Sequence, residues 1–233
     1  MNSFTERHHA FISATFYRLL KARQFDNYRA VFRMATRRYA EQRGGRMAQR
    51  ALRDGHELVF AAYRHYGEWE FTKEYVESLN GKPHIAVTEQ AQQLSYAVSA
   101  CPWADVYREM GLQGDGGCDY CQDLDPSIVR GFNPRLTYIV SQTLHESEVC
   151  LHTQQEAHLE RDADFGPKNS ENQRDFDYQC GHVYKTFSDA MRAIYKARGV
   201  ILSAQVLQVF AETFGQEMAD VLACHLVTDF DWI

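Results

Sequence analysis

The sequence predicts an α+β protein: a helical N-terminal half followed by a small antiparallel sheet flanked by helices. Two observations lead to this fold class. Apolar residues recur at helical spacing as far as Leu79, and from Ile85 onward runs of alternating apolar and polar residues occur. The turn residues Asn80–Pro83 separate the two patterns. We therefore expect a helical region over residues 1–80 and an α+β region over residues 81–233, either as two parts or as one compact domain.

The helical half contains four expected helices. Residues 4–22 and 25–40 carry apolar side chains at helical spacing. Gly44 and Gly45 end the second helix, because glycine weakens a helix interior. A third helix follows from Met47 to Tyr66 with an interruption near Gly55, and a fourth covers residues 69–79.

The second half begins with a strand that runs into a helix. Residues 94–100 alternate, and residues 104–110 form a helix that Gly111 ends. Residues 136–144 and 148–154 form a hairpin around His145-Glu146-Ser147, which gives a three-stranded antiparallel sheet. We expect a flexible loop at residues 114–117, a polar surface loop at 156–177, and closing helices at 184–197 and 203–227.

Composition limits the classes of function. The chain has 233 residues, of which 45% are hydrophobic, and a net charge of -6. It can bury a core of its own, and it has no overall basic field for nucleic acid. The basic residues between 18 and 53 fit a solvated helix face. No signal peptide and no membrane-spanning apolar run is recognisable, so we expect a cytoplasmic protein that binds no membrane. Spare aromatic residues in the helical half favour a homo-oligomer.

Six cysteines, spread from Cys101 to Cys224, are expected to be reduced and therefore able to act as nucleophiles or ligands. Cys101 precedes Pro102, a residue suited to the first position of a helix, so free amides and the helix dipole favour its thiolate. A buried structural cysteine is the alternative. Cys121 lies in an acidic loop, where its thiolate needs a cation such as an amidinium substrate or a metal. His182, where a helix is expected to begin, offers an imidazole.

Two further residues have open roles. Asp125 precedes Pro126 and either caps a turn or acts in catalysis. Asn133, held extended by Pro134, either shapes an Asx turn or faces a pocket. A second arrangement competes with a thiol enzyme, because Cys118, Cys121, Cys180 and His182 together supply the ligands of a structural zinc site.

The order of these motifs resembles the L-2-amino-thiazoline-4-carboxylic acid hydrolase family. The likeness covers roughly Leu94 to the C-terminus, and its most specific block is Gly131-Phe132-Asn133-Pro134-Arg135-Leu136. The resemblance implies hydrolysis of 2-amino-thiazoline-4-carboxylate, a cyclic isothiourea, to N-carbamoyl-cysteine. Two features depart from the pattern: the Cys118-x-x-Cys121 pair, and the polar continuation Cys150–Gln155 of the last strand, where more apolar residues are expected.

The sequence therefore favours a hydrolase that opens a small cyclic amidine or isothiourea bearing a carboxylate, and that needs no cofactor. Phosphate-loop, nucleophile-elbow and zinc-protease motifs are absent from the sequence. The alternative is a small-molecule sensor or binding module without enzymatic activity. In the hydrolase, Cys101 or Cys121 attacks the ring carbon, Asp125 pairs with the amidinium and His182 moves the proton. Asn133 orients the ring, and the substrate-binding residues are Asn133, Trp103 and Arg135.

Overall fold

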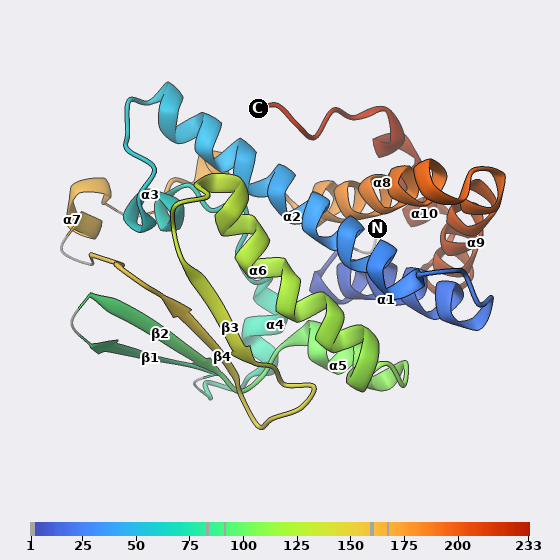
Figure 1. The fold of residues 1–233 in the computed structure, drawn as a ribbon, viewed down its shortest axis with the longest axis horizontal. Helices are drawn as coiled ribbons and strands as arrows, with labels where there is room; N and C mark the ends of the chain where they lie inside the picture. The colour runs from blue at the N-terminus through green and yellow to red at the C-terminus, as the bar shows by residue number, and fades with distance from the viewer. Residues whose placement is uncertain (1–2, 83, 91, 159–160, 167) are drawn as a thin grey trace. The chain divides into compact units, whose positions relative to one another are not determined.

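The computed structural model describes residues 3–82, 84–90, 92–158, 161–166 and 168–233 (Figure 1). The chain forms two compact units, each built from segments that are distant in sequence. Unit 1 comprises residues 1–39, 102–120 and 175–228, and unit 2 comprises residues 40–101, 121–174 and 229–233. The fold class predicted from the sequence is confirmed: helices predominate, and a small antiparallel sheet lies between helical segments of the chain.

Unit 1 is helical. Its α1 (Glu6–Ala22) packs against α5 (Pro102–Glu109), α8 (Phe176–Tyr195) and α9 (Ala197–Phe214), and α10 (Gln216–Cys224) packs against α8 and α9. Aromatic rings fill its core: Phe16 lies 5.4 Å from Phe187 between ring centroids, and Tyr17 lies 4.9 Å from Phe32. The short helical turns η1 (Gln113–Gly117) and η4 (His225–Val227) complete this unit.

Unit 2 holds the sheet. Among the described residues, β1 (Ile85–Gln90), β2 (Gln93–Val98), β3 (Tyr138–Gln142) and β4 (Cys150–Gln154) form a four-stranded sheet in the order β1-β2-β4-β3, with antiparallel neighbours. The predicted hairpin is confirmed as β3 and β4, whereas the sequence prediction of three strands lacked β1. The remaining elements are α3 (Phe60–His65), α4 (Lys73–Ser78), α7 (Asp162–Phe165) and η3 (Ser170–Asn172).

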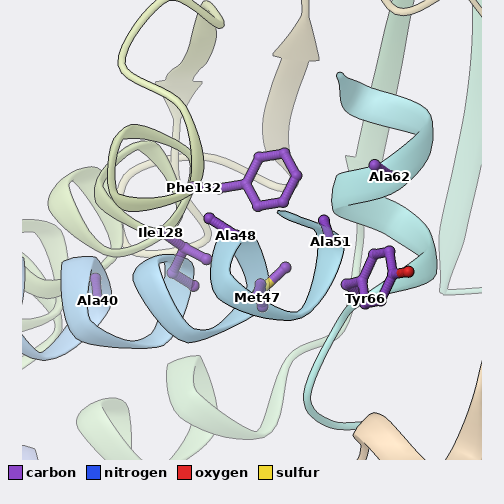
Figure 2. Close-up of a cluster of buried hydrophobic side chains, with 8 residues drawn as sticks. All are labelled: Ala40, Met47, Ala48, Ala51, Ala62, Tyr66, Ile128 and Phe132. Carbon is purple, nitrogen blue, oxygen red and sulfur yellow. The ribbon is translucent and has the colours of Figure 1, made fainter. Parts of the chain in front are cut away.

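Two long helices contribute residues to both units: α2 (Tyr28–Arg53) and α6 (Cys118–Phe132). In unit 2, small side chains of α2 pack against α3 and α6, and this core consists of Ala40, Met47, Ala48, Ala51, Ala62, Tyr66, Ile128 and Phe132 (Figure 2). The prediction that Gly44 and Gly45 end a helix is wrong, because α2 continues through both. A Cβ at Gly44 would lie 1.9 Å from the Ile128 carbonyl oxygen. This glycine is therefore needed for close helix packing rather than for a turn.

Three other local predictions are wrong. Residues 114–117 form a turn of π-helix that continues into α6, so Cys121 and Asp125 lie on a helix rather than in a loop. Helix α8 begins at Phe176, which places His182 in its second turn. Gly215, with φ 101°, divides the expected last helix into α9 and α10. In the described ranges, no helix has both the length and the apolar character needed to cross a bilayer.

Candidate active site

A thiol and an imidazole meet in unit 2. Cys121, half-buried on α6, has its Sγ 3.4 Å from Nε2 of His145. His145 lies in the turn between β3 and β4, and the buried Thr143 holds this turn. The Thr143 carbonyl accepts hydrogen bonds from the backbone N–H groups of Glu146 and Ser147, at 3.1 and 2.9 Å. The thiol therefore has a proton acceptor within hydrogen-bonding reach.

A carboxylate lies one helical turn further along α6, beside a second imidazole that comes from β4. Asp125 is four residues after Cys121, so the two side chains share a face of the helix. Asp125 Oδ2 lies 3.5 Å from Nδ1 of His152, and the Tyr138 hydroxyl lies 3.2 Å from the same nitrogen. Among the described residues, Nε2 of His152 and Oδ1 of Asp125 have no hydrogen-bond or ion-pair partner. Both atoms are therefore available to a ligand.

Strand register places these groups on one face of the sheet. Val140 and Tyr96 are the cross-strand partners of His152 on its two sides. Side chains two residues apart on a strand share a face, so Tyr138 and Cys150 project from this face as well. α6 covers this face at β4, as the contact between Asp125 and His152 shows. Figure 1 shows α6 beside β3 and β4.

The electrostatics of this face keep its other acidic groups protonated. Burial raises the pKa of Tyr138 well above its ordinary value, and the nearby Asp125 carboxylate adds to the rise. The same two causes, in the same order, raise the pKa of Tyr63 from α3. Burial also raises the pKa of the Cys150 thiol, and Asp125 contributes again. At neutral pH these two phenols are thus hydrogen-bond donors, and Cys150 is a thiol.

Asn133 directly follows α6 and holds the turn after it. Its side-chain nitrogen donates to the Leu58 carbonyl at 2.6 Å, and its side-chain oxygen accepts from the backbone N–H of Arg135 at 3.0 Å. Of the two roles considered from the sequence, the Asx turn is the one the structure contains. Arg135 is exposed. Asp125 does not cap a turn, since Pro126 lies inside α6, where the helix loses the hydrogen bond to the Gln122 carbonyl.

Cys101, Trp103 and His182 were also predicted as site residues. Cys101 is half-buried and directly precedes α5, as predicted. Trp103, in unit 1, is 7% exposed, and its indole N–H donates to Nδ1 of His9 at 3.0 Å. His182, also in unit 1, is 0% exposed, and its ring lies 4.5 Å from that of Tyr39. Neither unit on its own therefore brings His182 together with Cys121.

The residues of the zinc alternative are also divided. Cys121 belongs to unit 2, while Cys118, Cys180 and His182 belong to unit 1. The Cys118 thiol lies 3.7 Å from the Gln113 carbonyl oxygen, and burial raises the pKa of Cys180 well above its ordinary value. Within the part of the chain that the structure describes, no group of three or more His, Cys, Asp or Glu side chains is placed to hold a metal ion.

Sequence reasoning did not identify His145, His152 and Tyr138 as site residues. The sequence does contain one indication of His152. The strand that begins at Cys150 continues with polar residues where the family resemblance leads one to expect apolar ones. His152 is one of these polar residues, and it faces Asp125.

Comparison with known proteins gives one match. The model of the L-2-amino-thiazoline-4-carboxylic acid hydrolase family matches residues 5–150. This range includes the N-terminal helices, to which the motif resemblance did not extend, and it ends at the start of β4. Cys121, Asp125, Tyr138 and His145 lie inside the match, and His152 lies just beyond it. No curated protein and no solved structure matches the chain.

Proposed function

Because the chain belongs to the L-2-amino-thiazoline-4-carboxylic acid hydrolase family, we propose that it hydrolyses a small cyclic isothiourea or amidine bearing a carboxylate. The reference substrate is 2-amino-thiazoline-4-carboxylate, which yields N-carbamoyl-cysteine. Family membership alone does not fix the substrate, so the proposal also depends on the chemistry of the site.

One observation carries the proposal. A single face of α6 presents a thiol and a carboxylate, and each lies beside an imidazole from the β3–β4 hairpin or its second strand. Hydrolysis of a cyclic isothiourea requires a nucleophile, an anion for the cationic amidinium, and a proton donor for the leaving sulfur. The two pairs supply these three groups.

The first step is attack by Cys121. His145 takes the thiol proton, and Sγ forms a bond to the ring carbon between sulfur and nitrogen. The Oδ1 atom of Asp125 accepts a hydrogen bond from the amidinium, which holds the ring carbon toward Sγ. We assign the attack to Cys121, whose sulfur lies 3.4 Å from an imidazole nitrogen of His145.

The second step opens the ring. The bond between the ring carbon and the ring sulfur breaks, and His152 Nε2 gives that sulfur a proton, which leaves a substrate thiol and an isothiouronium on Cys121. Water then adds to the isothiouronium carbon and the bond to Sγ breaks. One water proton returns to His152 and the other goes to Sγ, while His145 releases its proton to solvent, and the carbamoyl product leaves with the water oxygen. We assign the proton transfer to His152 rather than to His182, because His182 is 0% exposed.

Release of a thiol provides the assay. Purified protein is incubated with 2-amino-thiazoline-4-carboxylate, and free thiol is followed with a chromogenic disulfide. We expect turnover by the wild type and a loss of about a hundredfold or more in kcat for Cys121→Ser and for His145→Gln. Cys224→Ser, which changes an exposed cysteine of unit 1, is the matched control and should keep full activity.

Two outcomes would overturn the proposal. Absence of turnover on this ring and on related cyclic ureas and amidines would favour a binding module. Full activity of Cys121→Ser would remove the thiol as nucleophile and leave water activated by an imidazole as the mechanism.

A further inference from the structure

Arg43 of unit 2 is a buried cation that has no anionic partner among the described residues. This residue of α2 is only 8% exposed. Its Nε has no hydrogen-bond partner in the described chain, and none of the described carboxylates forms an ion pair with it. Buried charges in folded proteins are normally paired, because an unpaired one loses its hydration without compensation. Arg43 therefore stands out as a group prepared for an external anion.

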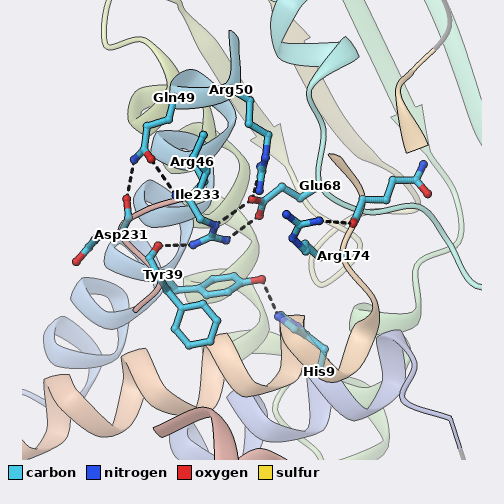
Figure 3. Close-up of polar contacts among 11 residues, drawn as sticks. His9, Tyr39, Arg46, Gln49, Arg50, Glu68, Arg174, Asp231 and Ile233 are labelled. Carbon is cyan, nitrogen blue, oxygen red and sulfur yellow. Dashed lines mark hydrogen bonds and ion pairs between the residues drawn. The ribbon is translucent and has the colours of Figure 1, made fainter. Parts of the chain in front are cut away.

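The next arginines on the same face of α2 show the contrast. Arg46 and Arg50 follow Arg43 at helical spacing and are 0% and 3% exposed. Both bind Glu68: Arg46 Nη2 lies 2.7 Å from Oε2, and Arg50 Nη1 lies 2.7 Å from Oε1 (Figure 3). Among the described residues, Glu68 is thus the carboxylate that pairs with Arg46 and with Arg50, and it forms no ion pair with Arg43.

The surroundings of Arg43 connect it to the candidate site. Its guanidinium carbon lies 5.1 Å from the centroid of the Trp69 ring, which supports the cation without neutralising it. The ring of Tyr63 on α3 lies 5.7 Å from that of Phe132 on α6, and the pKa of Tyr63 is raised by burial and then by Asp125, while Arg43 acts in the opposite direction. A phenol thus lies within the fields of Arg43 on α2 and of Asp125 on α6.

We propose that Arg43 binds the carboxylate of the substrate. The identity of that substrate rests on the proposed function, whereas the need of Arg43 for an anion rests on its burial and lack of a partner. The ring acid carries a cationic amidinium and an anionic carboxylate. Asp125 and Arg43 offer one opposite charge to each, and a guanidinium can bind a carboxylate through two parallel hydrogen bonds.

Binding of two ligands to two variants tests this assignment. The ligands are 2-amino-thiazoline-4-carboxylate and 2-amino-thiazoline, which lacks the carboxylate, and calorimetry on a Cys121→Ser background prevents turnover. Arg43→Met should weaken binding of 2-amino-thiazoline-4-carboxylate by about 10- to 100-fold, as expected for a hydrogen-bonded charged pair. It should leave binding of 2-amino-thiazoline unchanged. Equal affinity of Arg43→Met and its parent for the ring acid would overturn the assignment.

Thermal unfolding without ligand separates a binding role from a structural one. Arg43→Met removes an unpaired buried charge and keeps an apolar stem, so we expect a melting temperature at or above that of the wild type. Arg50→Met is the matched control from the same helix face, and it should lower the melting temperature because it removes a partner of Glu68. A drop for Arg43→Met as large as that for Arg50→Met, or failure of Arg43→Met to fold, would make Arg43 structural.

The two proposals fail separately. If the ring acid binds through Arg43 but is not hydrolysed, the hydrolase proposal fails and the carboxylate site remains. If the ring acid is hydrolysed and Arg43→Met has an unchanged KM for it, the carboxylate assignment fails and the hydrolase remains.

Discussion

Gly44 and Gly45 allow one substitution to be compared at adjacent positions of α2 with opposite expected results. A Cβ at Gly44 would lie 1.9 Å from the Ile128 carbonyl oxygen and 2.7 Å from the Phe132 backbone nitrogen. A Cβ at Gly45 would have no described atom within 4 Å apart from its neighbours in the chain and the nearby backbone of its own helix. Gly44→Ala therefore forces α2 and α6 of unit 2 apart, whereas Gly45→Ala requires no movement.

The size of the effect follows from these distances. Ordinary contact begins at 3.4 Å, so the Gly44→Ala methyl group needs a shift of 3.4 minus 1.9, or 1.5 Å. Backbone atoms cannot swing aside, and overpacking of this kind costs about 1 to 3 kcal/mol, here at the upper end. Both variants gain about 1 kcal/mol from the higher helix propensity of alanine, so the gain cancels in the comparison. Gly44→Ala should thus unfold about 6 to 12 °C below Gly45→Ala.

Activity provides a second measurement, because α6 carries Cys121 and Asp125. A displacement of about 1 Å at reacting groups can cost about a hundredfold in rate, so we expect Gly44→Ala to lose most of its hydrolysis of 2-amino-thiazoline-4-carboxylate. Gly45→Ala should keep the wild-type rate and be slightly more stable than the wild type. Equal melting temperatures of the two variants would refute the reasoning, since they differ only in the clash with α6.

Three further predictions concern charge, pH and thiol reactivity. Glu68→Gln should lower the free energy of unfolding, measured in urea, by about 3 to 5 kcal/mol, because two buried guanidinium groups lose their partner. Glu41→Gln, at an exposed ion pair, is the control and should lower it by under about 1 kcal/mol. Losses of the same size in the two variants would contradict this prediction. Burial lowers the pKa of His8 from 6.5 to about 4, so the stability it contributes is complete above pH 6.5 and falls toward pH 4. Between pH 7 and pH 5 we expect the free energy of unfolding to fall by about 1 kcal/mol, a figure that already allows for the partial exposure of His8. Urea titrations at the two pH values should show that His8→Gln abolishes this fall. Iodoacetamide at pH 8 should alkylate the half-buried Cys121 faster than Cys180, which is 0% exposed, and peptide mass spectrometry showing equal rates would argue against an accessible thiol.

Local sequence patterns predicted the elements that depend on local chemistry. Alternation located β2, turn residues located the β3–β4 hairpin, and Pro102 marked the start of α5. The wrong predictions arose where packing against a distant segment of the chain decides the local structure. Gly44 is favoured inside a helix because the α6 backbone approaches it, and no pattern within α2 contains that information. Pro126 lies inside α6 for a related reason: tertiary packing outweighs the loss of one helical hydrogen bond.

The candidate site was predicted in part for the same reason. Cys121 and Asp125 were selected because a thiol and a carboxylate are recognisable from residue type. Their imidazole partners were not, because the β3–β4 register and the packing of α6 on the sheet bring His145 and His152 to them. The sequence favoured His182 because it offers an imidazole at an expected helix start. Helix α8 begins earlier than that, and His182 is enclosed in unit 1.

Two features of unit 2 reduce stability and need an explanation beyond folding. Pro126 interrupts the hydrogen bonding of α6, and Arg43 buries a charge that forms no ion pair with any described carboxylate. A sequence selected for stability alone would remove each of these features, and departures from local rules tend to collect at functional sites. Pro126 lies on α6 itself, and Arg43 lies on α2, which packs against α6 in unit 2. Their association with α6, which carries Cys121 and Asp125, supports the location of the site independently of the family match.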